Sequence, residues 1–241
     1  MKTPPLLLVT ALAAAFFAVA CGSGEPPREI PEGIPPGAGT PVPDIDFNAQ
    51  GRTADLLLAW ADPQADAVNI SVPALAAYGH AAAVMSDTSP GCGIAWTTLA
   101  GIGFVESRHG TYQGSSVAAD GTVSPPIRGI PLDGGPGVAE IPDTDGGVMD
   151  GDPTHDRAMG PMQFIPETWK KWGVDANGDG VANPDNLDDA ALTAARYLCA
   201  RGGDLLTAEG WERALMAYNQ SGAYLRDVRD AAAAYSVGTA A

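Results

Sequence analysis

The sequence predicts a mainly α-helical domain that follows an N-terminal secretion signal and a tether. Segments with helical apolar spacing dominate the chain, and no clear strand or hairpin pattern appears. The 190 residues after Gly51 are enough for one domain, which at this size buries roughly 70% of its unfolded surface. A single helical domain over residues 52–241 is therefore the expected fold.

Local signals place the expected helices. Thr53 is a suitable N-cap, and Pro73 falls at a first-turn position. Leu187–Ala200 has acids in its first turn and is followed by Arg201, which suits the helix dipole. The expected helices are Thr53–Ala61, Pro73–Met85, Ile94–Ser107, Pro166–Trp172, Leu187–Ala200, Ala208–Tyr218 and Ala223–Tyr235.

Residues 1–20 are typical of a secretory signal peptide. Lys2 precedes the apolar run Leu6–Ala20, which is too short to span a bilayer comfortably. The run ends in small residues before Cys21, as in a bacterial lipoprotein cleavage box. We expect a lipid on Cys21 that anchors the protein to the outer face of the cell membrane. The alternative is ordinary secretion, which also leaves the chain outside the cytoplasm.

Residues 21–51 are expected to form a tether. The stretch is rich in Pro and Gly, has almost no aromatic residues and lacks periodicity. Such a segment buries too little apolar surface to order itself. It would hold the domain some distance from the membrane.

The cysteine count favours one disulfide. With Cys21 lipidated, Cys92 and Cys199 remain, and two cysteines outside the cell most simply pair. The alternative is two buried free thiols.

The chain is strongly acidic, with 29 Asp and Glu residues against 13 Lys and Arg and a formal net charge of −16. This balance argues against a nucleic-acid-binding surface and against simple electrostatic attachment to anionic membranes.

A long segment rich in Gly, Pro and Asp lies between His109 and Arg157. Loops of this length inside a compact domain are usually functional or disordered. Because it directly follows Glu106, we expect it to form a wall of a substrate cleft. The alternative is a floppy acidic insertion.

Glu106 is the first candidate for catalysis. It ends the otherwise uncharged stretch Trp96–Glu106, and burial of a carboxylate raises its pKa. A carboxylic acid protonated near neutral pH is what cleavage of a glycosidic bond needs, because the leaving oxygen must receive a proton. The alternative is a solvent-facing Glu at a helix end.

Four motifs occur together in a fixed order. They are Gly103–Gly110 (GFVESRHG), Ala158–Pro166 (AMGPMQFIP), the acidic loop from Asp175 to Asp189, and Ala217–Ser221 (AYNQS). This set resembles the lytic murein transglycosylases of the MltB type, in their actinobacterial lipoprotein form. The resemblance covers nearly all of Leu56–Tyr235.

The resemblance implies a lysozyme-like helical domain that binds peptidoglycan glycan strands. The expected reaction cleaves the β-1,4 bond between N-acetylmuramic acid and N-acetylglucosamine and leaves a 1,6-anhydromuramoyl end. Glu106 would be the single catalytic carboxylate, first acid and then base. The resemblance also implies a set of substrate-binding residues. In this set Ser107 would bond the acid or sugar, Gln163 would project into the cleft and Tyr218 would hydrogen-bond Glu106; the full set is Ser107, Gln163, Tyr197, Tyr218 and Asn219.

The acidic loop has the front half of an EF-hand. Asp175, Asn177 and Asp179 supply oxygen ligands at positions one, three and five, and Gly180 follows. Position twelve is Asn186 rather than the usual Glu, but the related enzymes close a longer loop with Asp, which here is Asp189. The expected structural calcium ligands are Asp175, Asn177, Asp179, Val181 (through its carbonyl) and Asp189. The alternative is an ion-free acidic turn.

Two other functions stay open from the sequence. A muramidase that uses water would need a second carboxylate, for which Asp143, Asp145, Asp150, Asp152 and Asp156 are available. A non-catalytic glycan-binding lipoprotein would keep the cleft without turnover. The presence of Glu106, Gln163 and Tyr218 argues against the second alternative.

Overall fold

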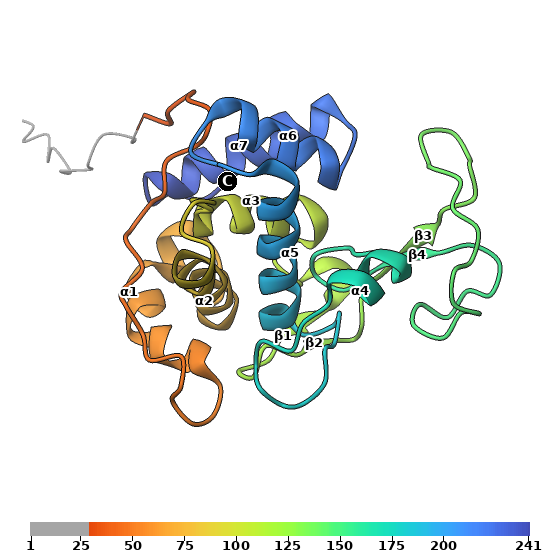
Figure 1. Ribbon diagram of the computed structural model, residues 1–241, viewed down its shortest axis with the longest axis horizontal. Coiled ribbons are helices and arrows are strands. Elements are labelled where there is room, and N and C mark those ends of the chain that lie inside the picture. Colours follow the sequence, from red (N-terminus) through yellow and green to blue (C-terminus); the bar gives the residue numbers. More distant parts are fainter. Residues whose placement is uncertain (1–28) are drawn as a thin grey trace, which may run out of the picture.

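The computed structural model describes residues 29–241 and confirms a mainly helical fold (Figure 1). The predicted signal peptide and Cys21 lie outside these residues, so both stay predictions. In chain order the elements are the 3-10 helix η1 (Thr53–Leu57), α1 (Leu58–Val68), α2 (Val72–Thr88), α3 (Trp96–Ser107), the 3-10 turn η2 (Tyr112–Gly114), β1 (Ser116–Val117), β2 (Val123–Ser124), β3 (Arg128–Pro131), β4 (Arg157–Met159), α4 (Pro166–Trp172), α5 (Leu187–Gly202), α6 (Ala208–Tyr218) and α7 (Gly222–Ser236).

The core is built around α2 and α3, which pack mainly against α5 and α7 respectively. Small residues allow close helix contacts at the centre of this core. A Cβ atom at Gly101 of α3 would lie 2.7 Å from the carbonyl oxygen of Val228 in α7. Glycine is therefore required where these two helices meet.

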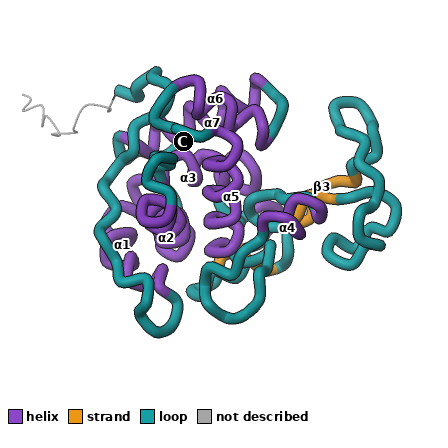
Figure 2. The backbone as a smooth tube through the Cα atoms, viewed as in Figure 1, coloured by secondary structure: helices purple, strands orange, loops and turns teal. Residues whose placement is uncertain are grey.

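Four short strands correct the expectation that the chain has none. β1 pairs with β2 and β3 pairs with β4, both antiparallel. Each strand has only two to four residues, so no apolar alternation is long enough to be recognised. Residues 128–159, which we call the arm, extend from the helical body and consist mostly of loop (Figures 1 and 2).

Part of the expected tether is packed on the domain. Backbone carbonyls of this segment accept hydrogen bonds from two indoles and a hydroxyl: Trp96 Nε1 donates to Thr40 (3.0 Å), Thr97 Oγ1 to Gly37 (2.8 Å) and Trp60 Nε1 to Pro41 (2.9 Å). The expectation of a free tether is wrong for residues 37–47, because neighbouring helices supply the donors and the apolar surface that the segment itself lacks.

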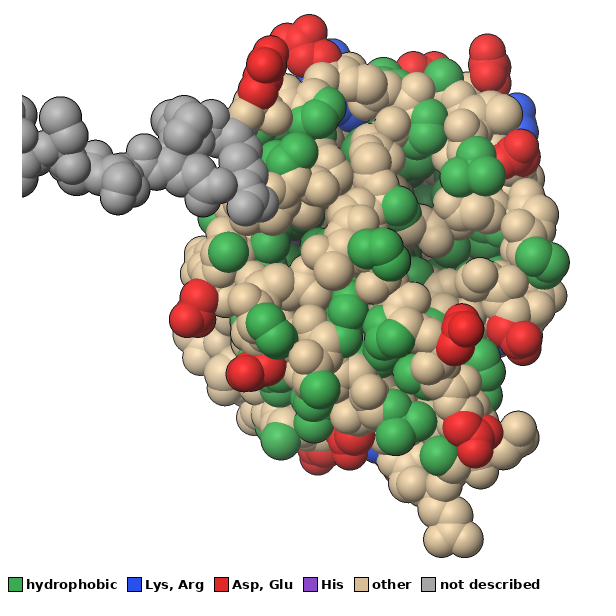
Figure 3. Space-filling model, turned by 90° about the vertical axis from the view of Figure 1, so that its left-hand side faces the viewer, with side chains coloured by type: hydrophobic (Ala, Val, Ile, Leu, Met, Phe, Trp, Pro, Cys, Tyr) green, Lys and Arg blue, Asp and Glu red, His purple; other side chains and the backbone are tan. Residues whose placement is uncertain are grey.

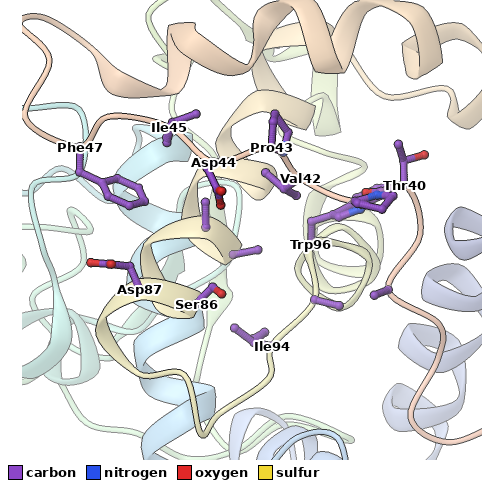
Figure 4. Close-up of a pocket in the computed structure, with 15 residues that line it drawn as sticks. Thr40, Val42, Pro43, Asp44, Ile45, Phe47, Ser86, Asp87, Ile94 and Trp96 are labelled. Atoms are coloured by element: carbon purple, nitrogen blue, oxygen red, sulfur yellow. The ribbon is translucent and has the colours of Figure 1, made fainter.

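A pocket of about 540 Å³ lies between this segment and the helices α2 and α3. Val42, Ile45 and Trp96 line it together with Asp44 and Asp87 (Figure 4). On the face of the molecule shown in Figure 3, hydrophobic side chains are spread widely and acidic ones lie mostly near the edge.

Arg52 fixes the end of the packed segment to α5. Its guanidinium donates to both carboxylate oxygens of Asp188 at 2.6 and 2.8 Å, and Asp188 is fully buried. Burial raises the pKa of Asp188, and the ion pair with Arg52 acts in the opposite direction. A buried carboxylate without this partner would be strongly destabilising.

Within residues 29–241, no one helix has the length and apolar character needed to cross a membrane. The segments Thr53–Val68 and Val72–Thr88 meet that criterion together, on length and composition alone, across a bend of 119°.

The predicted disulfide between Cys92 and Cys199 is confirmed. It joins the loop before α3 to the last turn of α5, with a Cα–Cα distance of 5.4 Å and a sequence separation of 107 residues. A cross-link that closes so long a loop restricts the unfolded chain strongly.

Replacing both cysteines by alanine is expected to lower the free energy of unfolding by about 5 kcal/mol, the value of the chain-entropy model for a loop of this length. Chemical denaturation measures the loss. Dithiothreitol should lower the stability of the native protein to that of the double variant and leave the double variant unchanged. An equal effect of the reductant on both proteins would contradict this role.

Candidate functional site

Glu106 lies in the last turn of α3, half-buried, with its carboxylate facing α7. Tyr224 of α7 donates a hydrogen bond of 2.7 Å to Glu106 Oε1. Tyr224 is buried, and the pKa of its hydroxyl is raised well above 10, so it stays protonated and donates at neutral pH.

Burial shifts the titration of Glu106. It raises the pKa of this carboxyl from 4.5 to about 7, while the hydrogen bond from Tyr224 acts in the opposite direction. Desolvation disfavours the charged form and a donor favours it. Near neutral pH the side chain can therefore both give and accept a proton.

The end of α3 is held by two consecutive left-handed residues, Arg108 (φ 53°) and His109 (φ 60°). Their N–H groups bond the carbonyls of Phe104 (3.0 Å) and Gly103 (2.9 Å). This closed C-terminal cap sets the direction in which the preceding turn, and so Glu106, faces.

The His109 ring then connects three helices. Its Nδ1 lies 3.2 Å from the hydroxyl of Tyr78 in α2, and its Nε2 lies 2.9 Å from that of Tyr235 in α7. Burial lowers the pKa of His109 to about 3, so the ring is neutral. The neutral ring can donate from one nitrogen and accept at the other, which satisfies both tyrosines.

Ser107 differs from its expected role. Its hydroxyl donates to the carbonyl of Pro161 at 2.6 Å and accepts from the N–H of Gly110 at 2.8 Å. The residue is 1% exposed. Ser107 therefore joins the first and second sequence motifs and is bonded to backbone groups instead of to Glu106.

Gln163 both closes a turn and lines the cleft that contains Glu106. It has a left-handed backbone (φ 50°), its Nε2 donates to the carbonyl of Gly160 at 2.8 Å, and it lines two clefts together with Glu106. A non-glycine residue at positive φ is uncommon. The turn places this side chain beside the acid.

Tyr218 does not bond Glu106, which corrects the expectation. Its hydroxyl donates to the carbonyl of Met162 at 2.7 Å, while its ring stacks on Tyr224 with an interplanar angle of 9°. Tyr218 thus supports the tyrosine that holds the acid. Tyr197 is also in the cleft wall, but its hydroxyl donates to the carbonyl of Ala217 at 2.8 Å.

The larger cleft beside Glu106 has a volume of about 810 Å³. One part of its lining comes from the end of α6 and the connection to α7 and includes Tyr218 and Asn219. Another part of its lining comes from the arm and is apolar, with Ile130, Leu132 and Ile141. The long acidic segment therefore does form a wall of this cleft, as expected.

Glu106 is the only carboxylate among the described residues that line this cleft. The arm aspartates considered as a second carboxylate line neither cleft that contains Glu106, and they bind their own loop. Asp143 and Asp145 accept from backbone N–H groups two to four residues later, and Asp156 bonds Thr144. Asp150 accepts from the N–H of Arg157, and Asp152 bonds the guanidinium of the same residue.

In the acidic loop the carboxylates also accept from backbone N–H groups. Asp175 bonds Gly178 (2.7 Å) and Gly180 (2.8 Å), and Asp179 bonds Val181 (2.8 Å). These are the Asx bonds of the ion-free alternative.

Asp189 closes the loop from the first turn of α5. Although fully buried, it accepts from Ala176 (2.7 Å), Asn177 (3.3 Å) and Asn183 (2.9 Å). Over residues 29–241, no three His, Cys, Asp or Glu side chains are grouped to hold a metal. Asp175, Asp179 and Asp189, the three carboxylates among the expected calcium ligands, therefore do not form such a group.

Tyr224 is the functional residue that sequence reasoning missed. It follows the Ala217–Ser221 motif by three residues, one turn into the next helix. A tyrosine in an amphipathic helix is usually a core residue, so nothing local distinguishes it. The one sequence feature that could have indicated Tyr224 is its position three residues after the Ala217–Ser221 motif, which was already assigned to the cleft.

Removing the Tyr224 hydroxyl is expected to raise the pKa of Glu106 above 7, because a bond that stabilises the carboxylate is lost. NMR titration of the Glu side-chain carboxyl carbons in Tyr224→Phe measures the shift. Tyr197→Phe is the matched control, since its hydroxyl bonds a backbone carbonyl instead. An unchanged pKa in Tyr224→Phe would contradict the assigned contact.

The raised pKa of Glu106 also predicts a pH-dependent stability. Between about pH 4.5 and 7 the folded state retains a proton that the unfolded state releases, so stability falls as pH rises. Glu106→Gln should thus be more stable than the native chain at pH 8, by about 1–3 kcal/mol, and nearly equal at pH 4. Urea unfolding at both pH values measures this, with the exposed Glu212→Gln as control. A difference independent of pH would contradict it.

One comparison with known proteins identifies a relationship. Residues 156–212 match the family model described as a transglycosylase SLT domain. This range includes Gln163, Tyr197 and the acidic loop, and it ends before Tyr218. Comparisons with curated proteins and with solved structures gave no significant match. This part of the chain is therefore similar to the transglycosylase SLT family.

Proposed function

We propose that this protein is a peptidoglycan lytic transglycosylase of the MltB type that cleaves the MurNAc-β-1,4-GlcNAc bond and leaves 1,6-anhydromuramoyl ends. The SLT match supports the enzyme class and the glycan substrate. The observation that carries the specific reaction is the isolation of Glu106. Its carboxyl group has a pKa of about 7, and among the described residues it is the only carboxylate that lines the cleft.

In the first step, protonated Glu106 gives its proton to the glycosidic oxygen that leaves with the GlcNAc unit. The C1–O4 bond breaks, and positive charge develops at C1 of the muramoyl unit. Burial favours the protonated form that this step needs. As Glu106 becomes a carboxylate, the hydrogen bond from Tyr224 stabilises the new charge.

In the second step, the C6 hydroxyl of the same muramoyl unit attacks C1. The Glu106 carboxylate takes the hydroxyl proton while the C1–O6 bond forms. Glu106 is then protonated again, and no water is consumed. The attack is intramolecular, so it has a large proximity advantage over water. The apolar arm wall reduces access of competing water to this site.

We also propose roles for the other residues that line the cleft and for Cys21. Gln163 would position a sugar hydroxyl or N-acetyl group beside the acid, and Asn219 and Tyr197 would contact the strand from another part of the cleft lining. The lipid on Cys21 and attachment to the outer face of the cell membrane are proposals that rest on the signal sequence alone.

Glu106→Gln is expected to reduce formation of anhydromuramoyl products by at least about 1000-fold, as loss of an acid that acts twice implies. Mass spectrometry of digested peptidoglycan measures these products, with Glu212→Gln as the control that retains activity. Predominantly reducing ends from the native protein would indicate a muramidase instead. Glycan binding without any cleavage would indicate a binding module.

We also propose, from the sequence pattern, that the acidic loop binds structural calcium. The hard oxygen side chains favour Ca²⁺ over softer ions, and its role would be to fix the loop before α5. Millimolar Ca²⁺ is expected to raise the thermal unfolding midpoint of the native protein by a few degrees. Asp175→Asn should lose this effect, and Asp143→Asn, in an arm turn, should keep it. An equal response to Mg²⁺ and Ca²⁺, or none, would reject the proposal.

A further inference from the structure

A pocket separate from the substrate cleft lies beside the disulfide. It has a volume of about 680 Å³ and is lined by the last turns of α2, the loop that leads to Cys92, the end of α4 and the second half of α5. None of its lining residues lines either cleft that contains Glu106. Small-molecule sites typically have volumes of roughly 300–1,000 Å³. The pocket is therefore large enough for a ligand, and the proposed glycan cleavage gives it no role.

The lining of this pocket is largely apolar. Met85 of α2 and Leu192 of α5 are buried, while Trp172 and Val174 are half-buried and keep apolar surface open to solvent. The Cys92–Cys199 disulfide also belongs to the lining and cross-links the loop on one side to α5 on the other. Partly exposed apolar side chains that line one hollow favour an apolar ligand group.

Arg196 is the only charged residue among the described residues that line this pocket. It is exposed, and no carboxylate in residues 29–241 forms an ion pair with it. A guanidinium can hold a carboxylate through two parallel hydrogen bonds. Arg196 can therefore bind the anionic group of a ligand without losing an internal partner.

Two further cations lie near the same pocket. Lys171 Nζ is 5.8 Å from the centre of the Trp172 ring, and Arg201 Cζ is 5.0 Å from the centre of the Tyr197 ring. These two rings are in edge contact, with their centres 5.6 Å apart. Neither cation forms an ion pair with a carboxylate in the part of the chain that the structure describes. In a chain with a net charge of −16, unpaired positive charges on α4 and α5 locally favour an anionic ligand.

We propose that this pocket binds a single-chain anionic amphiphile of the fatty-acid type, with its apolar chain against Met85, Leu192 and Trp172 and its carboxylate on Arg196. A neutral apolar compound would leave the guanidinium without a partner, and a small anion would leave the apolar lining in water. The membrane to which the signal sequence predicts attachment is a source of such amphiphiles. This inference goes beyond the proposed function and does not rest on the glycan chemistry.

Calorimetric titration with decanoate, kept below its micelle concentration, tests the carboxylate contact. Arg196→Gln is expected to weaken decanoate binding about tenfold and decanol binding less than about twofold, because only decanoate loses a charge-assisted hydrogen bond. Arg226→Gln, which changes an exposed arginine of α7 outside the pocket, should change neither. Acetate has the headgroup without the chain, so it should bind at least about a hundredfold more weakly than decanoate.

The apolar part of the site is tested in two ways. Val84 of α2 is half-buried in the lining, and Val84→Asp should abolish binding of both decanoate and decanol, with the thermal unfolding midpoint as the check on folding. NMR of the native protein needs no variant. The methyl signal of Met85 should shift on addition of decanoate, and that of Met216, an exposed residue of α6 outside the pocket, should not.

Absence of decanoate binding, or acetate binding as strong as that of decanoate, would reject the amphiphile. Equal losses of decanoate and decanol in Arg196→Gln, or no loss, would overturn the carboxylate contact. An unshifted Met85 signal at saturating decanoate would overturn the pocket as the binding site. Failure of the proposed function looks different, because it is an absence of anhydromuramoyl products and no residue of this pocket lines the cleft.

Discussion

The contact between α3 and α7 is the constraint on which the rest of the site depends. Gly101 lets the two backbones approach, and Tyr224 of α7 then reaches Glu106 of α3. The same helix pair is joined near the other end of α7 by Tyr235 and His109. One polar contact near the start of α7 and one near its end fix the rotation of α7 relative to α3. A rotation of either helix would separate the acid from its donor.

Although the chain is strongly acidic, the aspartates of the arm and of the loop before α5 bond to their own loops and do not line the cleft. In the arm and in the loop before α5, aspartates accept hydrogen bonds from the backbone within a few residues. These bonds stabilise loops that have little apolar surface to bury. They also leave the arm wall of the cleft apolar, so the field at Glu106 is not dominated by neighbouring negative charges. A high acid content and a single isolated acid are thus compatible.

The sequence predicted the helices well because their signals are local. Proline at first turns and apolar spacing placed all the α-helices within residues 29–241, although α1 continues through Pro63 to Val68, beyond the expected end. The expected N-cap at Thr53 is wrong, because Thr53 is the first residue of η1 and its hydroxyl lies 2.8 Å from Nε2 of His80. The short strands were not predicted, because two to four residues are too few to show an alternation of apolar and polar side chains. The packing of residues 37–47 was missed for another reason. Its hydrogen-bond donors, such as Trp96 and Thr97, lie more than 50 residues away.

The candidate site was predictable in its residue types and less so in its contacts. Glu106, Gln163, Tyr197, Tyr218 and Asn219 do come together in one cleft. Which tyrosine bonds the acid depends on how α6 and α7 turn at Ser221, and this geometry is not encoded in spacing. Ser107 was misassigned because adjacency in sequence to Glu106 suggested a shared direction. On a helix, consecutive residues face about 100° apart, which turns Ser107 towards Pro161.

A single carboxyl group can serve both proposed steps only if neither of its protonation states is strongly favoured. Burial alone would raise the pKa of Glu106 further, and too little of the carboxylate that the second step needs would then be present near neutral pH. A strong ion pair would push the pKa down and leave too little acid. A neutral hydroxyl donor opposes burial without cancelling it, and the pKa of about 7 is the result. An arginine or lysine in place of Tyr224 would remove that balance, which is a physical reason for a tyrosine at this position.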